Sequence, residues 1–161
     1  MNEPDRAVPT TKDINQRPSR ARYDKVKSTL DLKWRRRSPQ AERMLREVVD
    51  ALWDSFGESP WTRCGVWVLQ PDGKAFLPGP ARPAPAAAAV AAEGLLAAVL
   101  AAGQSRGEEG RLAVPVLDKD GRPWAVLEVV SGAGFDDMDQ RWLERLLKAV
   151  SQAPRPEKPP L

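Results

Sequence analysis

The segment Gly110–Gln152 places the strongest constraint on how this 161-residue chain can fold. It contains two apolar runs, Leu112–Leu117 and Trp124–Val130, joined by a short loop that includes Asp-Gly. Two β-rich runs joined by such a loop predict a β-hairpin. After a Ser-Gly-Ala-Gly break, large apolar residues recur with the spacing of one helical face, at Leu143, Leu146, Leu147 and Val150. The segment therefore predicts a hairpin followed by a C-terminal helix.

The residues before this segment predict a second hairpin and two more helices. The predicted elements are a helix over Ser38–Phe56, strands over Trp61–Leu69 and Lys74–Leu77, and a helix over Ala86–Ala102. Residues 78–85 are predicted to form a proline-rich connector, and residues 104–110 a flexible acidic loop. The element order is helix, strand, strand, helix, strand, strand, helix. It predicts an α+β fold with an antiparallel sheet flanked by helices, rather than a parallel doubly wound sheet.

Charge and proline content divide the chain into three parts. Residues 1–40 contain 11 Lys/Arg against 5 Asp/Glu, so the basic character of the chain belongs to its N-terminal arm. We predict a largely disordered basic arm over residues 1–37 with one short amphipathic helix, a domain over residues 38–152, and a proline-rich tail over residues 153–161.

The predicted arm helix, over residues 22–36, carries apolar residues on one face and basic residues around it. Two interpretations follow from this pattern. In the first, the apolar stripe packs on the domain or pairs with a second copy of the chain. In the second, the arm docks onto an acidic protein, a nucleic acid or a membrane surface. The residues that would dock are Tyr23, Val26, Leu30, Trp34, Arg35, Arg36 and Arg37.

Residue usage argues against several kinds of chemistry. The chain has no histidine and a single cysteine, so neither an intramolecular disulfide nor a cysteine-based metal cluster is expected. No serine lies in a nucleophile-elbow context, and no glycine-rich loop precedes a helix. Cys64 is predicted to be a small core residue, and Glu128 to face solvent or to pair with Arg63 or Arg111. We therefore expect no enzyme activity, no cofactor and no metal.

No segment of the sequence predicts export or membrane insertion. The start of the chain is polar and has no secretory signal, and the run Ala86–Ala102 is alanine-rich and contains Glu93. The expected location is the cytoplasm, with no membrane span.

The hairpin and the last helix resemble the end of a GAF domain. The matching features are the Val114-Pro115 pair in the first strand, the Asp120-Gly121 turn, the Ala125-Val-Leu strand, and Phe135 before Asp136-Asp137 at the helix start. The predicted first helix and first hairpin also fall where such a domain has them, so the resemblance spans roughly residues 38–152. Roadblock-like and profilin-like domains share a similar element order, and the Phe-Asp-Asp helix start favours the GAF comparison.

The resemblance implies a regulatory domain that often dimerises through its terminal helices. In GAF domains the middle region usually encloses a ligand pocket, whereas here residues 78–110 are dominated by Pro, Ala and Gly. Sequence patterns typical of cyclic-nucleotide and bilin sites are missing, as are the several cysteines used by free methionine sulfoxide reductases of this fold. A closed ligand pocket is therefore disfavoured.

Three functional hypotheses follow. The leading one is a non-catalytic regulatory or scaffolding module that binds another protein through its basic arm and forms a homodimer. The dimer residues would lie on the two terminal helices of the domain, at Val49, Trp53, Met138, Trp142 and Ala149. The alternatives are nucleic-acid binding through the arm, and small-molecule sensing in a reduced pocket lined by Trp67, Val116 and Trp124.

Overall fold

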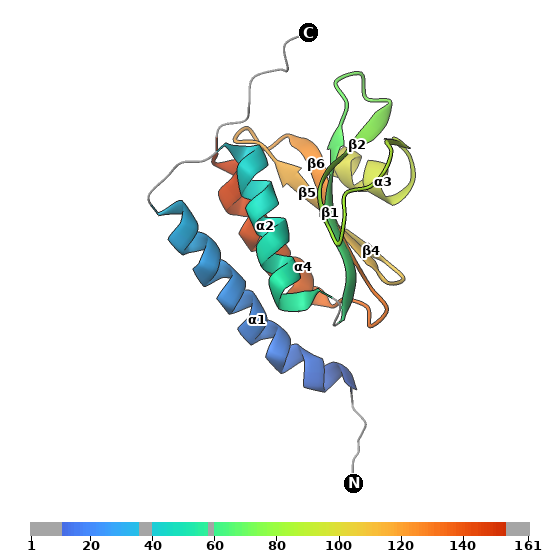
Figure 1. Ribbon diagram of the computed structural model, residues 1–161. Helices are drawn as coiled ribbons and strands as arrows, with labels where there is room; N and C mark the ends of the chain where they lie inside the picture. The colour runs from blue at the N-terminus through green and yellow to red at the C-terminus, as the bar shows by residue number, and fades with distance from the viewer. Residues whose placement is uncertain (1–10, 36–39, 58–59, 154–161) are drawn as a thin grey trace.

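The computed structural model describes residues 11–35, 40–57 and 60–153, which form four helices and a six-stranded sheet (Figure 1). The helices are α1 (Thr11–Trp34), α2 (Ala41–Phe56), α3 (Gly94–Ala102) and α4 (Asp137–Ser151). The strands are β1 (Trp61–Leu69), β2 (Ala75–Arg82), β3 (Val90–Ala91), β4 (Arg106–Glu108), β5 (Arg111–Leu117) and β6 (Pro123–Ser131). This is an α+β fold, and the predicted fold class is confirmed.

The sheet is antiparallel and has the order β3-β2-β1-β6-β5-β4. The first long strand, β1, therefore pairs with the last strand, β6, from Trp61 opposite Ser131 to Val68 opposite Ala125. The two outermost strands, β3 and β4, contain only two and three residues. Short edge strands limit unwanted pairing with other chains.

The two faces of the sheet carry separate hydrophobic cores. Alternate residues of a strand point to opposite faces, so neighbours along β6 divide between the two cores. The larger core lies beneath α2 and α4 and includes Leu127 and Val129. The smaller core, which we call the α3-side core, contains Val126 and lies beneath α3. Because both faces of β6 are covered, this strand is buried along almost its whole length.

Helices α1, α2 and α4 lie on one side of the sheet and α3 lies on the other (Figure 1). Helix α1 packs across α2 and α4 as an outer layer, with Tyr23, Val26 and Leu30 fully or almost fully buried. These three residues are spaced by three and four, so they occupy one helical face. The interpretation in which the arm's apolar stripe packs on the domain is the one that the structure shows.

The start of α4 is fixed by reciprocal hydrogen bonds. The Asp136 side chain accepts a bond from the backbone N–H of Asp139, and the Asp139 side chain accepts one from the N–H of Asp136. This arrangement is a capping box, which satisfies backbone donors that the first helical turn leaves free. Phe135, just before the cap, packs edge-on against Trp61. The cap residue is therefore Asp136, at the helix start where the sequence analysis placed Phe135 and Asp136-Asp137.

Several predicted boundaries differ from the structure. Helix α1 begins at Thr11, well before the predicted start at residue 22. The alanine-rich run forms a helix only from Gly94, because Val90–Ala91 pairs with β2 instead. Strand β2 continues to Arg82 through two prolines. Its partner β3 pairs only with Ala75 and Phe76, so the later part of β2 lies at the edge of the sheet, where the outer side needs no N–H donor. Residues 106–108, predicted as a loop, form β4. Ser38, the first residue of the helix predicted over Ser38–Phe56, lies outside the described residues.

Candidate functional site

The pocket predicted from the sequence does not form, because its three residues lie on opposite faces of the sheet. Trp67 belongs to the α3-side core. Val116 and Trp124 belong to the core beneath α2 and α4. All three side chains are buried. The sequence pattern assigned these residues to strands correctly, but the register of the strands separates them.

The α3-side core fills the face of the sheet that α3 covers. Helix α3 packs on β5 and β6, and its larger side chains meet those of the sheet. The core consists of Trp67, Phe76, Leu95, Leu96, Val99, Ala113 and Val126, all of them buried. This face of the sheet is therefore occupied by the chain's own apolar side chains.

An ion pair between the half-buried Arg111 and the buried Glu128 borders this core. Arg111 donates through Nε to Glu128 Oε2 at 2.7 Å, and Trp67 donates through Nε1 to Glu128 Oε1 at 3.0 Å. Both oxygens of the buried carboxylate thus have partners, as a charge removed from water requires. The Arg63 guanidinium lies over the Trp67 ring, 5.9 Å from its centroid. Of the predicted alternatives for Glu128, pairing with Arg111 is the one observed.

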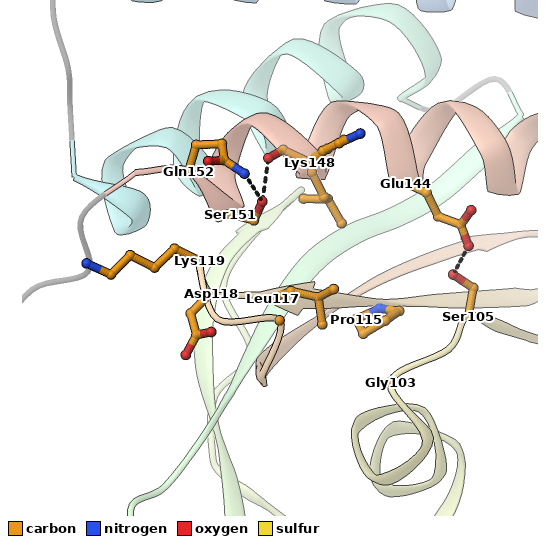
Figure 2. Close-up of a pocket in the computed structure, with 12 residues that line it drawn as sticks. Gly103, Ser105, Pro115, Leu117, Asp118, Lys119, Glu144, Lys148, Ser151 and Gln152 are labelled. Carbon is orange, nitrogen blue, oxygen red and sulfur yellow. Dashed lines mark hydrogen bonds between the residues drawn. The ribbon is translucent and has the colours of Figure 1, made fainter.

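An open cleft of about 410 Å³ lies between α4 and the end of β5 (Figure 2). Its apolar surface comes from Pro115, Leu117 and Leu147. Its polar groups are largely paired with one another. The Ser105 hydroxyl donates to Glu144, and the Ser151 hydroxyl donates to the Lys148 carbonyl. The ammonium groups of Lys119 and Lys148 point away from each other (Figure 2), so the cleft has no converging set of charges.

The turn between β5 and β6, beside this cleft, is held by hydrogen bonds from its backbone to Asp118. The Asp118 carboxylate accepts hydrogen bonds from the backbone N–H groups of Asp120 and Arg122. Such bonds are typical of aspartate in turns. Asp118 therefore stabilises the β5–β6 turn, as its sequence context predicts.

The arm residues proposed for docking fall into two groups. Tyr23, Val26 and Leu30 are buried inside the chain and Trp34 is half-buried, donating through Nε1 to Glu47 at 2.9 Å. Their apolar surface therefore packs against the rest of the same chain. Arg35 is exposed. The remaining predicted docking residues, Arg36 and Arg37, lie outside the described residues.

The predicted dimer residues lie on α2 and α4, the two helices that α1 packs against. Val49 is buried, and Trp142 is buried with its ring stacked on Tyr23 at 5.7 Å between centroids. Trp53 and Met138 are half-buried, and Ala149 is exposed. Helix α1 of the same chain thus packs on the apolar surfaces of α2 and α4 that the sequence analysis assigned to contacts with a second copy. Homodimerisation through these residues stays a prediction, and light scattering on the purified chain measures it.

The contact between α1 and α4 includes one titratable pair. The Tyr23 hydroxyl donates to Asp139 Oδ1 at 2.7 Å. Burial raises the pKa of Asp139 to about 6, and burial next to this carboxyl raises the pKa of Tyr23 above its ordinary value. The pair ties the N-terminal helix to the start of the C-terminal helix.

Two structural properties bear on the wider function. Within residues 11–35, 40–57 and 60–153, no cluster of three or more His, Cys, Asp or Glu side chains could hold a metal ion. None of the helices in the described part of the chain has the length and apolarity needed to cross a bilayer.

The fold is GAF-like. A solved GAF domain superposes with a TM-score of 0.66 at 16% identity, over 82% of this chain and 89% of that one. A putative GAF sensor protein from Burkholderia vietnamiensis gives a TM-score of 0.65 at 16% identity, over 86% of this chain and 94% of that one. A free methionine-R-sulfoxide reductase from Neisseria meningitidis, solved with its substrate, gives a TM-score of 0.67 at 20% identity, over 80% of this chain and 86% of that one. No protein-family profile and no curated protein sequence matches the chain.

The expectation that this chain is not an enzyme is contradicted by these similarities. Several of the similar structures are free methionine-R-sulfoxide reductases, which are enzymes. A GAF-like fold therefore carries catalysis in some proteins and none in others. The missing histidine and nucleophile elbow do not exclude activity on this fold.

The single cysteine is the residue that bears most directly on a thiol reaction. Cys64 lies in β1, is fully buried, and belongs to the core beneath α2 and α4. Burial raises the pKa of its thiol well above the ordinary value, so the thiol is neutral near pH 7. The thiolate is the reactive form of cysteine, and burial also blocks access to it.

We expect Cys64 to resist a water-soluble thiol reagent in the native chain and to react when the chain unfolds. With an aromatic disulfide reagent at pH 8, native labelling should be at least about a thousandfold slower than labelling in strong denaturant, because it requires opening of the core. Absorbance of the released thiolate measures both rates. Rapid labelling without denaturant would show that this core opens easily and exposes the thiol.

Proposed function

We propose that this chain is a GAF-like regulatory or scaffolding module that binds an acidic surface of another protein through the outer face of α1. This proposal rests mainly on the packing of α1 against the rest of the fold. Its apolar side packs on α2 and α4, so its outer side is presented on a rigid support. From Arg20 to Arg35, the residue directly after the helix, the sequence contains six basic residues and two acidic ones.

The outward residues fit a charged contact. Lys25, Lys33 and Arg35 are exposed, and none of them has an ion pair within the described part of the chain. Leu32, next to Lys33, is 62% exposed and offers an apolar anchor among the charges. Interfaces commonly combine an apolar centre with a charged rim that speeds and orients association.

The experiment is capture of partners by the full chain and by a charge-reversed variant. The variant changes Lys25, Lys33 and Arg35 to glutamate. The control reverses three exposed basic residues away from α1, namely Lys74, Arg106 and Lys119, and so has the same net charge. Protein captured by the wild type and by the control should be lost with the α1 variant and at high salt, because surface attraction is screened.

Nuclease treatment separates protein capture from nucleic-acid capture. A protein partner should remain bound after nuclease. Loss of capture on nuclease treatment would favour the nucleic-acid alternative, for which binding to generic duplex DNA should fall steeply with salt. Capture that is unchanged in the α1 variant would contradict the proposal.

A further inference from the structure

Three arginines surround a hollow of about 250 Å³ between α1 and α4. Arg20 comes from α1, and Arg141 and Arg145 come from α4. The apolar part of the wall is formed by Met138 and Trp142. The Arg145 guanidinium lies over the Trp142 ring, 4.8 Å from its centroid. The hollow thus combines three positive groups with an aromatic wall.

The fold fixes the positions of these arginines. Tyr23 stacks on Trp142 and donates to Asp139, and this contact locks α1 against α4. Arg20 lies one helical turn before Tyr23, so it is held close to α4. Arg141 and Arg145 are four residues apart and therefore project from the same face of α4. The convergence depends on the docking of α1 and is not visible in either helix alone.

The three arginines of this hollow have no ion-pair partner among the described residues. Asp24 and Asp137 lie one helical turn from Arg20 and Arg141 but form no ion pair with them in the described part of the chain. Two other nearby carboxylates have other partners. Asp139 bonds to Tyr23 and the Asp136 backbone, and Glu144 bonds to Ser105 and Gln140. Like charges four residues apart destabilise a helix, so an anion bound here would relieve a repulsion.

We propose that this hollow binds a phosphomonoester group. A phosphomonoester carries between one and two negative charges near neutral pH and offers three acceptor oxygens. Guanidinium groups match such oxygens in geometry and form charge-assisted hydrogen bonds with them. The hollow is smaller than the usual range for complete ligands, so it fits one phosphate-bearing group rather than a whole cofactor. The inference is independent of the acidic-partner proposal, because it uses none of Lys25, Lys33 and Arg35.

Titration of the full chain with phenyl phosphate, followed by proton–nitrogen NMR, tests the site. The six tryptophans give separate indole signals, and Trp142→Phe identifies the one from Trp142. That signal should shift on titration. The double variant Arg141→Gln/Arg145→Gln should bind phenyl phosphate at least about tenfold more weakly than the wild type, since two charge-assisted hydrogen bonds are removed. Arg46→Gln, a matched change at an exposed arginine on α2, should bind like the wild type.

Three further comparisons make the result decisive. O-phosphoserine should produce the same shifts if the phosphate is the recognised group. Acetate at the same ionic strength should produce none. Urea unfolding should show that the double variant is as stable as the wild type, because both arginines are exposed. Equal binding by the double variant, or equal shifts with acetate, would overturn the proposal.

Discussion

Replacing Tyr23 by alanine is expected to lower the free energy of unfolding by about 3–5 kcal/mol, the range seen when a large buried side chain is truncated. Tyr23 is fully buried, and its ring lies 4.6 Å from Phe56 and 5.7 Å from Trp142 between centroids. The change removes both aromatic contacts and the hydrogen bond to Asp139. It should also loosen α1 from the rest of the fold. Urea unfolding monitored by tryptophan fluorescence measures the loss.

Two companion variants separate the contributions at this position. Tyr23→Phe keeps the ring and loses only the bond to Asp139, so a decrease of about 1–3 kcal/mol is expected. Leu32→Ala, on the exposed side of the same helix, should change stability by no more than about 0.5 kcal/mol. Equal effects of Tyr23→Ala and Leu32→Ala would mean that α1 is not docked in solution.

Truncation of Glu128 to alanine is expected to destabilise the chain by about 3 kcal/mol. The change breaks a partly buried ion pair and leaves the Trp67 indole N–H without its acceptor. The Arg111 side chain is 37% exposed, so water can solvate its guanidinium once the Glu128 carboxylate is removed. The loss of stability should therefore lie at the lower end of the range for broken buried pairs. Thermal and urea unfolding measure the change.

The matched variants at this site are Glu128→Gln and Glu108→Ala. Glutamine retains an acceptor for Trp67 and removes only the charge, so its effect should be about half that of alanine. Glu108 forms the more exposed pair with Arg111, and its removal should cost less than about 1 kcal/mol. A Glu128→Ala variant as stable as the wild type would show that the pair contributes nothing to the fold.

The long periodic segments could be predicted from the sequence because their local patterns agree with their final packing. Strand β1 has the predicted bounds, and α4 begins directly after Asp136, at the predicted helix start. The middle region was harder to predict because helix propensity, although highest for alanine, is a small preference per residue that tertiary contacts can override. Pairing of Val90–Ala91 with β2 outweighs that preference.

The functional residues were harder to predict because they depend on contacts between distant elements. Nothing local places Trp67 and Val116 on opposite faces, since face assignment follows from strand register. The arginine hollow requires α1 to lie on α4, a contact between residues 116 positions apart in the case of Tyr23 and Asp139. The one local signal was the spacing of Arg141 and Arg145, two like charges on a single helical face.

The position of β6 has a consequence for synthesis of the chain. Strand β1 has a partner on one side as soon as β2 is made, but its other side stays open until β6 follows more than fifty residues later. Throughout that interval the emerging polypeptide exposes an unpaired strand edge rich in valine and tryptophan. Both hydrophobic cores can therefore close only after translation has passed Ser131. Chains interrupted before this point should be prone to aggregation and should depend on chaperones.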